Sequence, residues 1–327
     1  MKKSYWRGKR VLITGGTGTF GHAMVKHLLS FPELKRIAVL SRDEYKQSEM
    51  RREFPDERLS FFLGDIRDRM RLHRAFNSVD IVIHAAALKQ VPALEYNPSE
   101  AIETNIIGTK NVIDAAHDRD VGQVLLISTD KAVQPINLYG ATKLCAERLA
   151  VAANAYRGAT GKTRISVVRY GNVIGSRGSL LELIEKQRAS GVITLTDKRM
   201  TRFWIHINDI MHIVTNILAS MEGGEIFVPK MKGLRVVDVM QAVAPECRIK
   251  TIGIRPGEKL HEALMTEHEA RRAKDAGDVI VILPEFRSWG TKNLFAKRKP
   301  FPSDIEYVSN NMKLLFSLKD VKKILKL

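Results

Sequence analysis

The chain has 327 residues, 44% of them hydrophobic, which is enough for one large domain or two unequal ones around a substantial core. Its 53 Lys and Arg residues outnumber 36 Asp and Glu residues, giving a formal net charge of +17 and a sequence pI of about 9.9. This composition excludes a disordered chain. No apolar run approaches the roughly 20 residues that span a bilayer, so we expect no membrane segment.

The basic excess indicates an anionic partner, either nucleic acid or phosphorylated small molecules. The positive charges are spread along the chain, with small clusters at residues 297–299 and in the C-terminal KKILK. They are not interleaved with aromatic residues, as they would be in a typical nucleic-acid surface. The pattern favours a solvated face with a few phosphate contacts, and we expect no nucleic-acid partner.

The N-terminus, cysteines and histidines bear on location and metal content. Residues 1–16 are basic and then apolar, but the apolar part is only a few residues long and ends in glycines, so we expect no export. Cys145 and Cys247 lie far apart without metal-type spacing, which favours two free thiols in a reducing cytoplasm. The nine histidines form no HExxH pattern, and we predict no metal site.

The first strand and helix enclose a glycine-rich turn. Residues 10–14, RVLIT, predict a buried strand, and a helical apolar pattern begins at residue 22. The GGTGTFG between them fits both G-x-G-x-x-G and G-x-x-G-x-x-G. In this context the glycines let the backbone approach a pyrophosphate resting on the helix N-terminus. We therefore predict dinucleotide-binding residues in this turn: Gly15, Thr17, Gly18, Thr19, Phe20 and Gly21.

The second predicted strand, RIAVL, ends about 20 residues further on in Ser41, Arg42 and Asp43. An acid at this strand tip would hold a ribose 2′-hydroxyl, whereas an arginine accommodates a 2′-phosphate. Because Ser41 and Arg42 come first and Asp43 falls into the next loop, we favour NADP over NAD.

The next two strands add cofactor contacts. The strand in LSFFLGDIRD ends in Asp65 and Ile66, where the carboxylate could pair with an adenine edge and the aliphatic chain could stack on it. The strand in DIVIHAAALKQVP is followed by Ala85 and Ala86, whose small side chains permit close approach of a cofactor. Lys89 follows as a candidate contact to cofactor or substrate.

Strand and helix signals alternate five times in the first 155 residues, which predicts an α/β fold with a doubly wound parallel sheet of Rossmann type. A sixth strand, ISVVRYGNVIG, leads into a helix within residues 176–191. We divide the chain into a nucleotide-binding domain with the catalytic residues, 1–174, and a smaller interlaced substrate lobe, 175–327.

The stretch from Leu125 to Ala155 carries the reactive side chains. An apolar strand ends in Ser128, Thr129, Asp130 and Lys131, and a following helix presents Tyr139 and Lys143 four residues apart on one face. An ammonium beside a phenol lowers the pKa of the phenol and can bind a nicotinamide ribose. A tyrosinate there could take the proton of a sugar hydroxyl while hydride leaves the same carbon.

These blocks also carry a family resemblance. TGGTGTFG, STDKA before YGATK, and RYGNVIGSRGS resemble the extended short-chain dehydrogenase/reductase superfamily. Within it, STDKAVQPINLYGATK, TDKRMTRFWI and GIRPGEKLHE are similar to the soluble, inverting UDP-N-acetylglucosamine 4,6-dehydratases that open pseudaminic acid biosynthesis. The resemblance spans residues 8 to 265 and implies a cytoplasmic homo-oligomer, a hexamer being one such assembly.

The resemblance implies that Lys131 is the base for the proton on carbon 5 and Asp130 the acid for the departing hydroxyl, beside Thr129 and Tyr139. The implied product is UDP-2-acetamido-2,6-dideoxy-beta-L-arabino-hex-4-ulose. A lysine base needs a depressed pKa, and desolvation beside Lys143 is expected to lower that of Lys131. For Asp130 to act as an acid, its pKa needs to be raised.

The resemblance further implies contacts of Asn172, Arg202, Arg255 and Glu258 with the nucleotide sugar, besides Lys89 and Thr129. Arginine suits a diphosphate because its fork donates two parallel hydrogen bonds, although either arginine could instead serve a structural ion pair. Glu258 could accept from the ribose hydroxyls of uridine.

Other functions stay open. A nucleotide-sugar 4-epimerase would use Thr129, Tyr139 and Lys143 without elimination. A retaining 4,6-dehydratase typically carries added membrane segments or replaces the tyrosine. A non-catalytic nucleic-acid-binding or redox-sensing protein would explain the charge, but it would not need Asp130 and Lys131 beside Tyr139.

Overall fold

A nine-stranded sheet forms the centre of the computed structural model, which describes residues 3–156, 161–176, 179–286, 294–302 and 306–311. Its strand order is β14-β15-β10-β6-β5-β4-β1-β2-β3. The strands from β10 to β3 run parallel, and β15 and β14 pair antiparallel at one edge. The predicted doubly wound parallel sheet is therefore confirmed. The C-terminal KKILK cluster lies outside the described residues.

The strands of this sheet are short, and the central ones are mostly apolar and buried, as expected for strands with helices on both faces. Their bounds are β1 Arg10–Thr14, β2 Arg36–Ser41, β3 Leu59–Leu63, β4 Ile81–His84, β5 Gln123–Thr129, β6 Arg164–Tyr170, β10 Ile226–Pro229, β14 Ala273–Asp275 and β15 Val279–Ile282.

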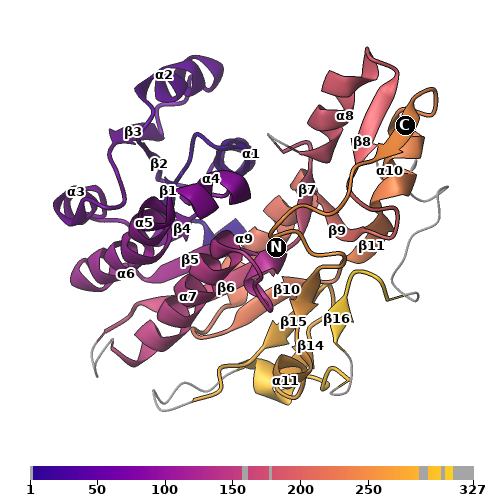
Figure 1. Cartoon of the computed structure of the whole chain (residues 1–327). Helices are drawn as coiled ribbons and strands as arrows, with labels where there is room; N and C mark the ends of the chain where they lie inside the picture. The colour runs from indigo at the N-terminus through magenta and orange to yellow at the C-terminus, as the bar shows by residue number, and fades with distance from the viewer. Residues whose placement is uncertain (1–2, 157–160, 177–178, 287–293, 303–305, 312–327) are drawn as a thin grey trace.

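The helices are arranged by right-handed crossovers, which place those after β1 and β2 on one face and those after β3, β4 and β5 on the other. Helix α9 packs against α1, and α6 contacts both α3 and α7 (Figure 1). Within the described ranges no helix is long and apolar enough to cross a membrane. The helical bounds are η1 Lys3–Tyr5, α1 Thr19–Leu29, α2 Glu44–Glu53, α3 Arg69–Ala75, α4 Val91–Tyr96, α5 Pro98–Ile102, the π segment η2 Glu103–Ile107, α6 Gly108–Asp118, η3 Asp130–Ala132, α7 Leu138–Ala152, η4 Ala153–Ala155 and α9 Ile207–Ser220.

A second group of elements forms a lobe beside the carboxyl ends of the parallel strands (Figure 1). It contains the sheet β11-β9-β7, the pair β12-β8 and helices α8 and α10, with apolar clusters of its own. Strands β10, β14 and β15 follow residue 174 but complete the central sheet, so the two parts of the chain are interlaced. A boundary at residue 174 stays a prediction. The remaining bounds are β7 Asn172–Ile174, α8 Leu180–Arg188, β8 Val192–Leu195, β9 Thr201–His206, β11 Lys232–Arg235, α10 Val236–Val243, β12 Arg248–Thr251, β13 Ala263–Met265, α11 Glu267–Ala270, η5 Leu294–Lys297 and β16 Tyr307–Val308.

The predicted sixth strand is divided at Gly171. Strand β6 ends at Tyr170 in the central sheet, and β7 begins at Asn172 and pairs with β9 in the second sheet. A Cβ atom on Gly171 would lie 2.6 Å from the Cβ of Phe203, so glycine allows β9 to pass closely. The chain thus leaves the central sheet beside the carboxyl end of β5.

Candidate active site

The glycine-rich turn lies at the point where the strand order of the sheet reverses, between β1 and β4. Gly15 has φ +66°, and a Cβ there would lie 2.8 Å from the Cα of Ala86 at the end of β4. A Cβ on Gly21 would lie 2.4 Å from the Cα of Gly16. These contacts require glycine, and they bring the N-terminus of α1 next to a crevice where open α/β sheets bind dinucleotides.

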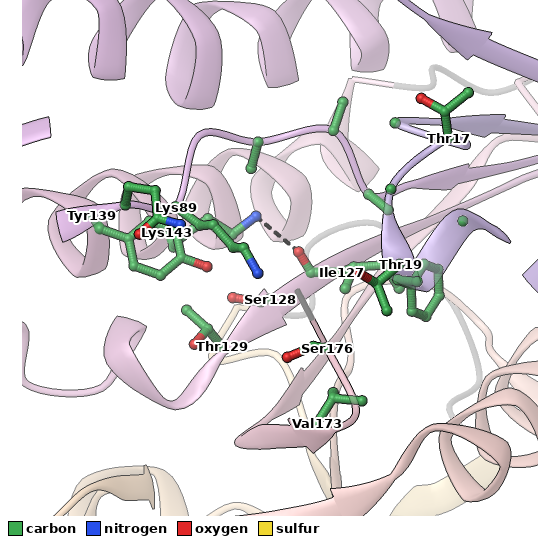
Figure 2. A pocket seen from close by; sticks show the side chains of 18 of the residues that line it. Thr17, Thr19, Lys89, Ile127, Ser128, Thr129, Tyr139, Lys143, Val173 and Ser176 are labelled. Carbon is green, nitrogen blue, oxygen red and sulfur yellow. Dashed lines mark hydrogen bonds between the residues drawn. The ribbon is translucent and has the colours of Figure 1, made fainter. Parts of the chain in front are cut away.

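A pocket of about 960 Å³ occupies this crevice and continues to the end of β5 (Figure 2). Its volume suits a large ligand. The structure brings together at its wall every residue predicted for the cofactor and the reaction, namely Gly15, Thr17, Gly18, Thr19, Phe20, Gly21, Ser41, Arg42, Asp65, Ile66, Ala85, Ala86, Lys89, Thr129, Asp130, Lys131, Tyr139 and Lys143.

One end of the pocket, beyond β2, carries the side chains predicted to select the cofactor. The Asp65 carboxylate lies 3.4 Å from Arg42 and 2.7 Å from Arg67. Asp43 caps α2 by accepting from the backbone N–H of Lys46 at 2.9 Å, and it also pairs with the Lys46 ammonium. Asp43 is thus engaged within its own helix, while Arg42 and Lys46 supply positive charge at the wall.

Lys143 lies at the other end, on the face of α7 that packs on β5. Its Nζ donates to the carbonyl of Ile127 at 2.8 Å, and the residue is 3% exposed (Figure 2). Burial lowers the pKa of Lys143 to about 8, although the nearby Glu147 carboxylate acts in the opposite direction.

Tyr139 follows a different electrostatic pattern from the predicted one. Burial raises the pKa of its phenol, and the Lys131 ammonium and a hydrogen bond with Thr129 offset only part of that rise. The expectation that Lys143 lowers the pKa of this phenol is therefore wrong. Lys143 turns its ammonium to Ile127, and the cation that acts on the phenol is Lys131.

Asp130 and Lys131 form an ion pair in η3, directly after β5, with Lys131 Nζ 3.0 Å from Asp130 Oδ1. Thr129 donates to the same oxygen at 3.0 Å, and the Asp130 side chain is only 1% exposed. Burial lowers the pKa of Lys131, but the Asp130 and Glu262 carboxylates outweigh it and raise that pKa well above its usual value. The prediction that burial beside Lys143 lowers the pKa of Lys131 is wrong, because two carboxylates face Lys131 and one of them is remote in sequence.

The predicted sugar contacts divide into two sets. Asn172 lines the pocket, whereas Arg202, Arg255 and Glu258 lie outside its wall. Arg202 is 8% exposed and donates to the carbonyl oxygens of Thr201, Leu260 and Lys259. Arg255 is exposed, and its backbone N–H donates to the Glu258 carboxylate at 3.3 Å. Roles in binding the sugar remain predictions for all four.

Several lining residues escaped the sequence reasoning, among them Thr104, Tyr170 and Trp204. Tyr170 ends β6 and pairs with Thr129 at the end of β5, so its position at a strand tip was an available signal. Thr104 lies in a π segment and Trp204 in the crossing strand β9, and neither has a local pattern that indicates a site. Among the described residues, no group of three or more His, Cys, Asp or Glu side chains could hold a metal ion.

The fold and this pocket define the extended short-chain dehydrogenase/reductase class, in which a dinucleotide crevice ends at a Tyr and Lys pair on one helix. Comparison with family models matches residues 11–284 to the polysaccharide biosynthesis protein family. The chain therefore belongs to this polysaccharide biosynthesis family of extended short-chain dehydrogenases/reductases.

Two curated relatives represent two activities. The UDP-N-acetylglucosamine 4,6-dehydratase (inverting) of Campylobacter jejuni is 46% identical over 284 residues, covering 86% of this chain and 85% of the relative. The UDP-glucose 4-epimerase of Rickettsia conorii is 38% identical over 326 residues, covering 97% and 95%.

Solved structures support the same class. Pen from Bacillus thuringiensis superposes with a TM-score of 0.90 at 36% identity and covers 98% of each chain. The dTDP-glucose 4,6-dehydratase DesIV of Streptomyces venezuelae, solved with NAD bound, has a TM-score of 0.70 at 26% identity and covers 77% of this chain and 86% of its own.

Proposed function

We propose that the chain is an inverting UDP-N-acetylglucosamine 4,6-dehydratase that uses NADP. The observation that carries the proposal is the contact of 3.0 Å between Lys131 and Asp130 at the wall of a dinucleotide pocket. An acid and a base side by side suit elimination of water, whereas an epimerase needs only the oxidation and re-reduction of one carbon. The inverting dehydratase of Campylobacter supports the same reaction.

A pyridine nucleotide fits the glycine-rich turn. A Cβ on Gly15 would clash with the backbone of Ala86, and the lack of side chains on the glycines lets the backbone of the turn approach a pyrophosphate. When bound, it accepts hydride from carbon 4 of the sugar and returns hydride to carbon 6. Arg42 at the far end of the pocket favours NADP, because its exposed guanidinium can approach a 2′-phosphate while Asp43 is occupied as a helix cap and as the ion-pair partner of Lys46.

The protein groups then carry the proton transfers. Tyr139, acting as a tyrosinate, takes the proton of the 4-hydroxyl as the carbon–hydrogen bond at carbon 4 breaks, and the resulting ketone acidifies carbon 5. The neutral amine of Lys131 takes the carbon-5 proton, and its electron pair forms the double bond to carbon 6 as the carbon–oxygen bond breaks. Asp130 protonates the departing hydroxyl, which leaves as water. Uptake of a proton from solvent water by carbon 5, on the face opposite to Lys131, inverts that carbon.

The resting ion pair explains how both groups reach their reactive forms. Transfer of one proton from the Lys131 ammonium to the Asp130 carboxylate, along their contact of 3.0 Å, gives a neutral amine and a protonated acid. No net charge is created inside the site by this transfer. After elimination the same two groups are again ammonium and carboxylate.

One NMR time course with UDP-N-acetylglucosamine, NADP and deuterated water tests the reaction. The expected product has a 4-keto group, a methyl group at carbon 6, deuterium at carbon 5 and the inverted configuration there. A product that keeps its 6-hydroxyl would support the 4-epimerase, for which the Rickettsia relative is the supporting comparison. Retention at carbon 5 would support the retaining dehydratase.

The Lys131→Ala variant tests the base. We expect unchanged nucleotide binding, measured by calorimetry, and loss of deuterium uptake at carbon 5, because Lys131 lines the pocket whereas the neighbouring Lys259 and Glu262 lie outside its wall. Deuterium uptake at the wild-type rate would exclude Lys131 as the base. Steeply salt-dependent binding of RNA or DNA, without turnover of the sugar nucleotide, would instead support the non-catalytic alternative.

The proposal extends to the setting of the enzyme. The dehydratase reaction would be a step of polysaccharide or pseudaminic acid biosynthesis. The enzyme would act in the cytoplasm as a homo-oligomer. The free thiols of Cys145 and Cys247 support a reducing compartment. Sedimentation of the purified protein would test the hexamer that the family resemblance implies.

A further inference from the structure

Glu262 is a buried carboxylate behind the catalytic loop, outside the wall of the pocket. It is 2% exposed and directly precedes β13, a strand that packs against η3. Its backbone N–H donates to Ser309 Oγ at 2.9 Å, and its carbonyl accepts from the Ser309 N–H at 2.8 Å. The main chain at this position is therefore held on both sides.

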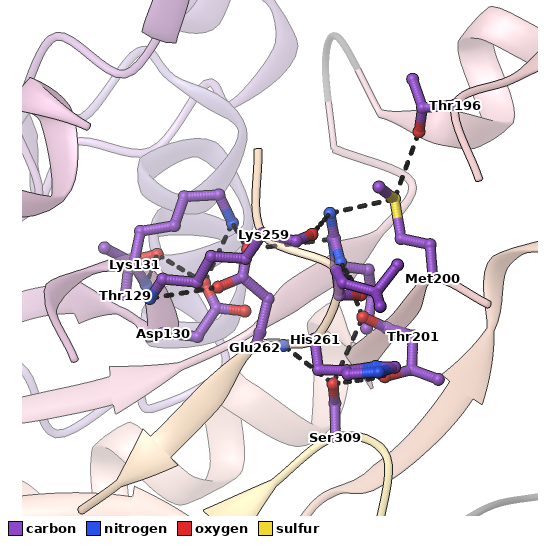
Figure 3. A network of polar contacts seen from close by, with 12 residues as sticks. Thr129, Asp130, Lys131, Thr196, Met200, Thr201, Lys259, His261, Glu262 and Ser309 are labelled. Atoms are coloured by element: carbon purple, nitrogen blue, oxygen red, sulfur yellow. Dashed lines mark hydrogen bonds and ion pairs between the residues drawn. The ribbon is translucent and has the colours of Figure 1, made fainter. Parts of the chain in front are cut away.

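Three cations surround this carboxylate (Figure 3). Lys131 Nζ lies 3.4 Å from Oε1, Arg202 Nε lies 3.8 Å from the same oxygen, and Lys259 Nζ lies 3.7 Å from Oε2. Removal of one partner from such a buried cluster leaves an uncompensated charge. Glu262 is thus placed to determine the charge of groups that do face the substrate.

We propose that Glu262 is a positioning residue for the elimination, which holds Lys131 between two carboxylates and stabilises the ammonium that Lys131 becomes on taking the carbon-5 proton. The inference rests on the proposed function. It assigns to the GEKLHE segment a part in the chemistry itself, carried through Lys131 and not through contact with the sugar nucleotide.

The charges around Lys131 determine whether replacing Glu262 raises or lowers the pKa of Lys131. The Asp130 and Glu262 carboxylates face its ammonium, and Arg202 opposes them. On the other side lie the Tyr139 phenol and Lys89, with Lys259 beyond Glu262. The Asp130 and Glu262 carboxylates both stabilise the Lys131 ammonium. Replacing Glu262 by a neutral residue therefore makes Lys131 easier to deprotonate, and the ammonium that forms on taking the carbon-5 proton becomes less stable.

The Glu262→Gln variant tests this through the pH profile of elimination, followed as deuterium uptake at carbon 5 and as formation of the 6-deoxy product. We expect the midpoint of the rising limb to move to lower pH by about one unit and the plateau rate to fall by about tenfold or more. Glu262→Asp keeps the charge and should keep the midpoint near that of the wild type.

The Lys259→Met variant should shift the pH midpoint in the direction opposite to that of Glu262→Gln. Lys259 lies outside the pocket wall, pairs with Glu262 and repels the Lys131 ammonium directly, so its removal should move the midpoint to higher pH. This second variant also keeps the inference testable if Glu262→Gln folds poorly. Equal midpoints in the wild type and Lys259→Met, or shifts of both variants in one direction, would overturn the proposal.

Glu225→Gln provides the matched control, since Glu225 is fully buried and accepts from Ser166 Oγ at 2.7 Å on the far side of β6. It should lose thermal stability without a shift of the pH midpoint. An equal shift there would assign the effect to general loosening of the core. If wild-type protein forms no 6-deoxy product, the proposed function fails; if it does and Glu262→Gln keeps the wild-type midpoint, only this inference fails.

Discussion

Lys143 combines deep burial with a single hydrogen bond to a backbone carbonyl, that of Ile127. Its folded-state pKa of about 8 lies below the ordinary 10.5, chiefly because burial disfavours the ammonium. Between these two values the unfolded chain binds more protons than the folded one. Stability therefore rises with pH across this window, and the full penalty of burying the charge is present below about pH 8.

We expect the free energy of unfolding of the wild type to gain about 3 kcal/mol from this group between pH 8 and pH 10.5. Lys143→Met removes the titrating amine while keeping most of the side-chain volume. Urea unfolding at the two pH values, in both proteins, measures the difference in slope. Parallel pH dependence in wild type and variant would show that the ammonium is not destabilised by burial.

Helix α7 and the short helix η3 are fitted against each other at Gly140. A Cβ atom there would lie 2.1 Å from the carbonyl oxygen of Lys131. Tyr139 precedes this glycine, so the close approach of the two elements lies between the residue proposed to accept the 4-hydroxyl proton and the proposed base of the elimination. We expect this fit to set the position of Lys131 relative to Tyr139.

Gly140→Ala should displace η3 from α7 and reduce turnover by about 100-fold, since small misplacements of reacting groups are costly. Gly122→Ala is the control, because its Cβ would lie 3.3 Å from the Asp80 carbonyl, at the opposite end of β5. Product formation and thermal unfolding of both variants separate the two effects. Full activity of Gly140→Ala would mean that the close fit is not required.

Arg169 joins three elements behind the active site. It lies in β6, is 1% exposed, and contacts the carboxylates of Glu147 in α7 at 2.6 Å and Glu269 in α11 at 3.0 Å. Glu147 also accepts from Ser128 Oγ at 2.5 Å, at the tip of β5. This network connects the catalytic helix to the C-terminal part of the central sheet.

Arg169→Met should lower the free energy of unfolding by about 3 to 5 kcal/mol, because two buried carboxylates lose their cation. Arg69→Met breaks the exposed pair with Asp118, at 3.4 Å, and should have a much smaller effect. Denaturant unfolding of both variants provides the comparison. Similar losses in the two would indicate that water reaches the Arg169 network.

At the scale of the whole molecule, the dinucleotide crevice joins the first strands to the β5 loop, so a bound nucleotide should stabilise the folded chain as a unit. At a concentration of about 100 times its Kd, NADP should add about 2.7 kcal/mol to the free energy of unfolding. Thermal unfolding with NADP and with NAD at equal concentrations measures the preference. Arg42→Ala should reduce the shift with NADP more than that with NAD; the reverse order would favour NAD as the cofactor.

Local patterns in the sequence were sufficient to predict the parallel sheet, the glycine turn and the reactive stretch ending in Tyr139 and Lys143. Each depends on neighbouring residues: apolar runs form buried strands, glycine permits a close turn, and a spacing of four residues selects one helix face. Because parallel strands bring their carboxyl ends to one edge, these patterns also predicted which residues would meet there.

Only the tertiary structure decided the protonation of the reactive groups. Lys131 was expected to have a lowered pKa from its neighbours in sequence, but the chain brings Glu262 to it from another part of the fold. Gly171 interrupts an apparently continuous strand because β9 crosses it closely. Burial and charge depend on all the segments that surround a group, and pairings between distant segments leave no periodic signal in the sequence.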